Sequence, residues 1–168
     1  MNIEKQSTPE LTQIGKLIEN FSVAMMTTVD PSGSLVSRPM SPIEMDAQGA
    51  LWFFTDLRSE KIEHLRVVNL AFSDEDAATY VSLSGRGEIH AETEHIAKLW
   101  TPFARPWFPD GPESTNIALL KFVLDTAEYW DAPNSKMVRM LAMAASIAAS
   151  KPIGMGEHET LSDLALAQ

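Results

Sequence analysis

Short runs of strand-forming residues alternate with tight turn sequences through the first third of this chain. Strands are predicted at 21–29 and 35–44, on either side of Asp30-Pro31-Ser32-Gly33. A second turn, Asp46-Ala47-Gln48-Gly49, leads into a third predicted strand at 51–55. Connections this short join neighbouring antiparallel strands, and Pro, Gly, Asn and Asp supply the backbone geometry that they need. The pattern therefore predicts an antiparallel meander.

The remaining periodic segments extend this sheet and place helices around it. Alternating apolar and polar residues predict further strands at 67–73, 79–89, 117–125 and 127–131. Apolar residues at helical spacing and helix-capping residues predict helices at 9–20 (with Thr8 as its cap), 59–66, 94–100 and 136–150. We expect a mainly β domain with peripheral helices over residues 1–150. The tail over 151–168 is expected to be mobile or packed on a partner subunit.

Composition narrows the chemistry. The 168 residues fit one domain, and the absence of cysteine excludes disulfides, iron–sulfur clusters and thiol nucleophiles. A net charge of −10 would repel a phosphate backbone, so nucleic acid is not expected as a partner. No apolar signal region follows the N-terminus and no segment is apolar enough to span a membrane, so we expect a cytoplasmic protein without membrane contact.

Against this acidic background, one turn gathers hydroxyls and cations. Thr55, Arg58, Ser59 and Lys61 follow an aromatic strand and precede the helix predicted at 59–66. Amides at a helix start, hydroxyls and cations together bind phosphate. On the preceding strand, Arg38 and Met40 point to one face, where a planar ring could lie. The pattern favours a nucleotide-like cofactor with one phosphate; ordinary surface ion pairing is the alternative.

Two prolines bear on the same region. Pro39 and Pro42 lie inside a predicted strand, where each removes a backbone donor from the ladder. Such prolines mark either an edge guarded against aggregation or a place where the backbone meets a ligand. The neighbouring Arg38 and the turn after Thr55 favour the ligand.

Other chemistries find little support. None of the four histidines pairs with another at the spacing of a helical zinc site, so no metal is expected. No serine lies in a nucleophile elbow, and no strand-to-helix glycine motif for a dinucleotide occurs. The aromatic, proline-rich segment 100–112 is expected to be a packed loop, with a lid or a partner contact as the alternative.

Several blocks, in their order and spacing, resemble the flavin-binding general stress proteins of the pyridoxamine-phosphate-oxidase-like split-barrel superfamily. The likeness covers roughly residues 11–139 and is carried by Ala24-Met25-Met26-Thr27-Thr28-Val29-Asp30, Ser37-Arg38-Pro39-Met40, Leu51-Trp52-Phe53-Phe54-Thr55 with Ser59-Glu60-Lys61, Val81-Ser82-Leu83-Ser84-Gly85-Arg86-Gly87, and Glu128-Tyr129-Trp130-Asp131-Ala132-Pro133.

The resemblance implies a six-stranded antiparallel split barrel, the FMN-binding split barrel, that forms a homodimer with a cofactor groove at each side of the interface. It further implies FMN as cofactor, with FAD or a deazaflavin as alternatives. By the same resemblance, the ring would lie along Arg38, Pro39 and Met40, flanked by Phe54 and Thr55. Ser59 and Lys61 would hold the phosphate. Three tryptophans would close the ring from the other subunit: Trp100, Trp107 and Trp130.

The expected function is that of a flavin-dependent oxidoreductase linked to the stress response, with a small-molecule electron donor and acceptor. The alternatives are a flavin-binding sensor or storage module without turnover and a deazaflavin-dependent reductase. True pyridoxamine-phosphate oxidases end in a block with Trp and Arg-x-His that grips the substrate. Residues 159–168 contain no such block, so that oxidase activity is not expected.

Overall fold

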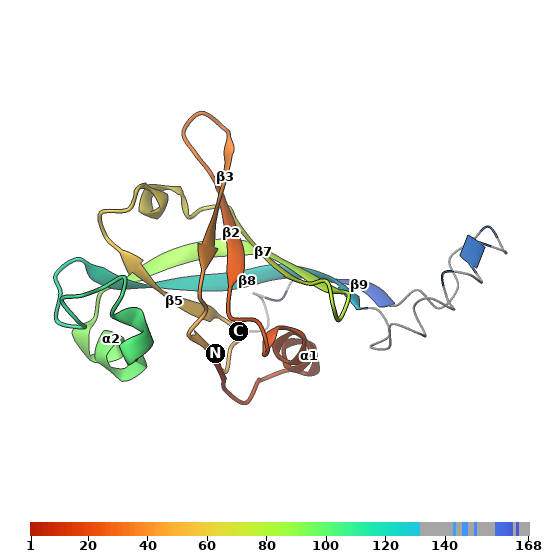
Figure 1. The fold of residues 1–168 in the computed structure, drawn as a ribbon, viewed down its shortest axis with the longest axis horizontal. Coiled ribbons are helices and arrows are strands. Elements are labelled where there is room, and N and C mark those ends of the chain that lie inside the picture. The colour runs from red at the N-terminus through yellow and green to blue at the C-terminus, as the bar shows by residue number, and fades with distance from the viewer. Residues whose placement is uncertain (132–142, 144–145, 148–149, 151–156, 163, 165–168) are drawn as a thin grey trace.

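The computed structural model describes residues 1–131, 143, 146–147, 150, 157–162 and 164. One sheet with helices at its periphery dominates this part of the chain (Figure 1). The helices are α1 (Pro9–Ile18) and α2 (Thr93–Leu99), with short 3₁₀ segments η1 (Glu60–His64) and η2 (Pro102–Ala104). The strands are β1 (Asn2–Ile3), β2 (Ala24–Val29), β3 (Leu35–Met40), β4 (Glu44–Met45), β5 (Leu51–Asp56), β6 (Val68–Asp74), β7 (Thr79–His90), β8 (Ile117–Asp131) and β9 (Glu157–Leu161).

Within the described residues, hydrogen bonding links the strands in the order β1-β4-β5-β8-β7-β6-β2-β3, and β9 pairs with β8. Every pair is antiparallel except β1 with β4, which is parallel. This described sheet has nine strands, where the resemblance implies six, because the short strands β1, β4 and β9 also pair. The ladder is open, with β1 and β3 at its two ends, so the described strands do not form a closed hydrogen-bonded ladder. The expected mainly β class is confirmed.

Strand β8 makes this arrangement possible through its length. It pairs with β7 from Leu119 to Asp131, while its other edge takes β5 first and β9 further along. The sequence prediction of two strands, 117–125 and 127–131, is therefore wrong: they form one. In its described part, the tail pairs with β8 of the same chain, which the sequence did not predict. The division at residue 150 and any contact of the tail with a partner stay predictions.

Two predicted segments break up for local reasons. The strand expected at 35–44 ends at Met40 and resumes at Glu44, with Pro42 in the gap, where it has no N–H to donate. The helix expected at 59–66 is only the 3₁₀ segment η1. The helix predicted at 136–150 falls almost wholly outside the described residues.

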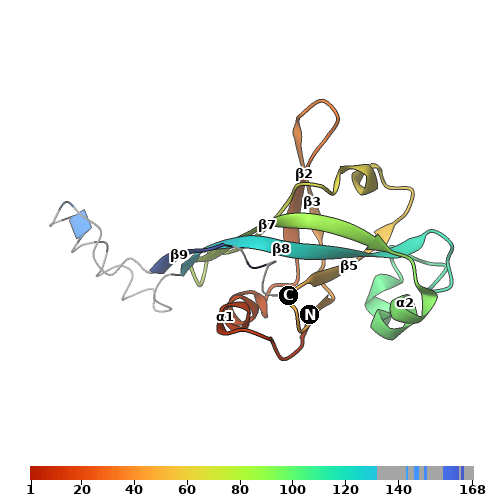
Figure 2. The same cartoon turned by 180° about the vertical axis from the view of Figure 1, so that it is seen from behind.

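Helix α1 covers the main core as its sequence predicts. Thr8 caps it, since the backbone N–H of Leu11 donates to Thr8 Oγ1 at 3.2 Å, and Leu11, Ile14 and Ile18 are buried. These side chains pack with the inward-facing residues of β2, β5, β6 and β7. Seen from either side, α1 and α2 lie below the long β7–β8 ribbon, and the β2–β3 turn and η1 lie above it (Figures 1 and 2).

A glycine shapes the long β7–β8 ribbon. The register between these strands shifts between Ser84 and Gly85. A Cβ on Gly85 would lie 2.0 Å from the carbonyl oxygen of Val123, so only glycine fits this close approach. Glycines inside a predicted strand, as at Gly85 and Gly87, indicate a bend or a close backbone approach, and the close approach is present at Gly85. Among the described residues, no helix has the length and apolar character needed to cross a membrane.

Candidate functional site

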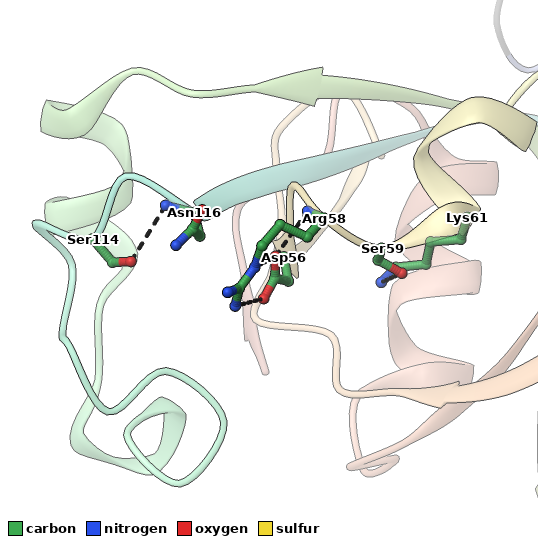
Figure 3. A network of polar contacts seen from close by, with 6 residues as sticks. All are labelled: Asp56, Arg58, Ser59, Lys61, Ser114 and Asn116. Carbon is green, nitrogen blue, oxygen red and sulfur yellow. Dashed lines mark hydrogen bonds and ion pairs between the residues drawn. The ribbon is translucent and has the colours of Figure 1, made fainter.

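The turn that follows β5 is fixed to its surroundings by backbone hydrogen bonds. The N–H of Ser59 donates to the carbonyl oxygen of Asp56 at 3.0 Å, and that of Leu57 donates to Asn116 O at 2.8 Å. The N–H of Asn116 in turn donates to Ser114 Oγ at 3.3 Å (Figure 3). The start of β8 therefore holds the turn that presents Ser59 and Lys61.

Lys61 is the central cation of this turn. Its Nζ reaches back to Ser59 Oγ and donates to it at 3.1 Å, with the side chain half-buried (Figure 3). Burial lowers the pKa of Lys61, the nearby charge of Arg38 lowers it further, and Asp56 opposes both effects. Two cations held together at a partly buried place favour the binding of an anion.

Arg38, the second cation near Lys61, lies on β3. It lies opposite Met26 in the β2–β3 register, and its Nη1 donates to Thr28 Oγ1 at 2.9 Å. Met40, two residues on, shares this face and packs against the main core. Pro39 points to the other, exposed face, opposite Met25. The structure thus brings the guanidinium of Arg38 and the thioether of Met40 to one side, and leaves only the backbone of Pro39 there.

Thr55 is a buried polar residue near the end of β5. Its side chain lies on the same face of the strand as those of Leu51 and Phe53 and is 1% exposed. Its Oγ1 is buried and has no hydrogen-bond partner among the described residues. Because a buried hydroxyl without a partner costs about 1–3 kcal/mol, such groups are uncommon outside sites with a functional reason.

Arg58 does not join the other cations. It folds onto Asp56, with Nη2 at 2.6 Å from Oδ2 and Nε at 3.0 Å from Oδ1, while its backbone N–H also donates to Oδ1 at 2.8 Å (Figure 3). The hydrogen bonds from Arg58 lower the pKa of Asp56 to about 2. In this structure Arg58 is therefore paired with Asp56 rather than with Ser59 or Lys61, and its part in a phosphate site stays a prediction.

Neither Asp56 nor Thr28 was singled out from the sequence. Asp two residues before Arg within a turn is a sequence signal for such a bidentate pair, because an Asp side chain readily accepts from the N–H two residues on. Thr28 carries no comparable signal. Its contact with Arg38 depends on the register between β2 and β3, which the turn between them sets.

The helix start expected at Ser59 is present, since Ser59 is the N-cap residue of η1, but it does not begin the longer helix expected at 59–66. The η1 segment is five residues of 3₁₀ helix, and the Ser59 N–H is already bonded to Asp56. Too few peptide dipoles line up here to act as a helix end. Side chains, rather than a helix dipole, therefore make this site cationic.

The predicted aromatic residues are spread over three places. The ring of Phe54 lies on the opposite face of β5 from Thr55, 5.6 Å from the ring of Trp100, in a second apolar cluster with α2. Trp107 is 73% exposed on the loop after α2. Trp130 stacks on His158 at 4.8 Å, twelve positions along β8 from Ala118, the partner of Thr55. Within one protomer, none of these rings is shown to meet Lys61, and their role at a cofactor stays a prediction.

Comparison with known proteins decides the family. A model described as "Pyridoxamine 5'-phosphate oxidase like" matches residues 9–153. The chain belongs to this family. No curated protein matches its sequence significantly. Among solved structures, a protein from Jannaschia sp. CCS1, provisionally described as general stress protein 26, is 24% identical, with a TM-score of 0.71 over 92% of this chain and 99% of that one.

Two other solved structures carry cofactor descriptions. The general stress FMN/FAD binding protein from Xanthomonas citri is 30% identical, with a TM-score of 0.63 over 76% of this chain and 93% of that one. A pyridoxamine 5'-phosphate oxidase-related, FMN binding protein from Nostoc punctiforme PCC 73102 is 16% identical, with a TM-score of 0.64 over 74% of this chain and 84% of that one. The family expected from the sequence is confirmed, and so is the coarse fold, a mainly β structure like that of these relatives.

The Asp56–Arg58 pair of this pyridoxamine 5'-phosphate oxidase-like protein predicts a pH dependence. With its pKa lowered to about 2, Asp56 stabilises the fold above its ordinary pKa of 3.8, and this contribution is lost as the pH falls through 2. We expect the Asp56 carboxyl to titrate near pH 2 by NMR. In Arg58→Gln the midpoint should rise towards 3.8, since only the backbone donor remains. A midpoint already near 3.8 in the wild type would contradict the pairing.

Proposed function

We propose that this protein binds FMN at the turn after β5 and works as a flavin-dependent oxidoreductase linked to the stress response. The observation that carries this proposal is the convergence of Lys61 and Arg38, partly buried, in a chain of net charge −10. Membership of the family and the FMN/FAD-binding relative from Xanthomonas citri support the choice of flavin.

The side chains fit a phosphate monoester that bears an aromatic ring. Lys61 and the hydroxyl of Ser59, already 3.1 Å apart, would hold the phosphate, and the buried, unpartnered hydroxyl of Thr55 lies at the end of the preceding strand. Arg38, oriented by Thr28, and Met40 would lie along the ring. When bound, FMN supplies electron transfer, and these side chains supply binding, orientation and positive charge.

The same proposal includes a homodimer with a cofactor groove at each side of its interface. The outer face of the β2–β3 hairpin exposes apolar side chains at both ends: Leu35, 75% exposed, pairs with Val29, and Met25 pairs with Pro39. Val67, just before β6, is 64% exposed. Exposed apolar side chains gathered on one side of a molecule are typical of an interface between subunits. Trp107 and Trp130, which are exposed in one protomer, would reach the cofactor from the partner.

Removing the proposed phosphate ligand tests the site directly. We expect the wild type to bind FMN much more tightly than riboflavin, which has the same ring without the phosphate. Lys61→Ala should weaken FMN binding about 10- to 150-fold and leave riboflavin nearly unchanged, because a charge-assisted hydrogen bond contributes about 1.5–3 kcal/mol. Titration by flavin fluorescence quenching measures all the constants.

Arg38→Ala is the matched variant for this titration. It should weaken both ligands if the guanidinium lies against the ring, and FMN alone if it reaches the phosphate. Equal affinity of the wild type for FMN and riboflavin would refute the phosphate site.

Electron transfer separates an enzyme from a sensor or storage module. We expect a nicotinamide cofactor to bleach the flavin absorbance of the FMN-loaded protein under anaerobic conditions, and an added acceptor to restore it over many cycles. The spectrum of the bound cofactor also distinguishes a flavin from a deazaflavin. A loaded protein that no nicotinamide cofactor reduces would favour the module without turnover.

Light scattering at low micromolar concentration tests the dimer. We expect a mass of twice 18.5 kDa, since an obligate interface of about 2,000 Å² or more does not dissociate at this concentration. Leu35→Glu, which places a charge on the proposed interface, should shift the mass towards the monomer and weaken FMN binding with it. A wild-type monomer that binds FMN at full strength would contradict the shared groove.

A further inference from the structure

A surface groove continues from the proposed phosphate site. It has a volume of about 400 Å³ and is lined by residues 57–60 and 62–64 and by Pro31, from the turn between β2 and β3. Ser59 belongs both to the groove and to the proposed site, so the two adjoin. The lining residues come from the β2–β3 turn and from the segment that contains η1, both of which lie above the β7–β8 ribbon in Figure 1.

The charges along this groove are unfavourable for a second anion. Glu60 and Glu63 line it with two carboxylates. Its one guanidinium, that of Arg58, is engaged by Asp56 through two hydrogen bonds of 2.6 and 3.0 Å, and the charge of Asp110 acts on it as well. Arg58 is therefore neutralised where it lines the groove, while Lys61 and Arg38 stay at the end of β5.

We propose that Asp56 is a specificity-determining residue that makes this site select FMN over FAD, by neutralising the guanidinium of Arg58 at the wall of the groove. The inference rests on the proposed function. FAD extends FMN from its phosphate through a second phosphate, and the groove that starts at Ser59 is the path open to that extension. In the wild type the second phosphate meets Glu60 and Glu63 without a cation to match it.

The exposure of the pair makes the restraint reversible. The Arg58 side chain is 72% exposed and that of Asp56 34%, so neither is locked by packing. Asn at position 56 keeps the shape and can still accept from the Arg58 backbone N–H, but loses the charge that holds the guanidinium. Freed in this way, Arg58 can turn into the groove that it already lines and pair with a second phosphate.

Calorimetric titration of FMN and FAD into the purified protein tests this inference, with the ratio of the two dissociation constants as the readout. We expect the wild type to favour FMN, and Asp56→Asn to shift the ratio about tenfold towards FAD. Adding Arg58→Gln to Asp56→Asn should abolish that shift, because the gain requires the freed guanidinium. Arg58→Gln alone should leave the wild-type ratio within about twofold.

Glu63→Gln gives an independent route if Asp56→Asn does not fold. It removes an exposed carboxylate from the groove wall and should shift the ratio towards FAD a few-fold, with FMN affinity kept. A wild type that binds both flavins equally, or a shift that survives in the Asp56→Asn and Arg58→Gln double variant, would overturn the role of Asp56 and leave the FMN site standing. A wild type that binds neither flavin would instead overturn the proposed function.

Discussion

The antiparallel pairing of β7 with β8 is the interaction on which the rest of this structure depends. These are the two longest strands described. They pair along the whole length of β7, and the bulge at Gly85 is the one irregularity in this ladder. β6 adds to the free edge of β7, and β5 and β9 share the free edge of β8. Every other element described is attached to this pair directly or through one of these strands.

This central pair also places the candidate site. The start of β8 pairs with the end of β5, and Asn116, just before β8, accepts from the N–H of Leu57. Ser59 and Lys61 are thereby held at a fixed turn rather than on a free loop. Arg38 lies at the far end of the strand order, on β3, and its charge acts on Lys61 because η1 lies on the connection from β5 to β6, the neighbour of the β2–β3 pair. The cationic site therefore exists only in the folded sheet.

Electrostatics divides the turn after β5 into two parts of opposite character. Among the described residues, Lys61 and Arg38 form no salt bridge, whereas Arg58 is paired with Asp56. Under the proposed function, this division would let a chain of net charge −10 bind one phosphate and disfavour a larger anion beside it. The short segment from Asp56 to Lys61 would then serve both binding and selection.

The sequence by itself determined the local features of this protein. Four such features depend only on neighbouring residues and backbone sterics, which the sequence specifies directly. They are the Thr8 cap, the turn at residues 30–33, the apolar strand at Leu51–Asp56 and the close backbone approach at Gly85. The hydroxyl and amino groups of Ser59 and Lys61 were recognisable for the same reason.

Only the tertiary structure decided which groups meet. The strand order and register bring together residues that are far apart in the chain: Thr28 with Arg38, Arg38 with Lys61, and β9 with β8. The pairing of Arg58 with Asp56 is by contrast local, since the Asp56 carboxylate accepts from the Arg58 backbone N–H two positions on and lies within reach of the guanidinium. That Lys61 instead lies near the charge of Arg38 was decided only by the tertiary structure.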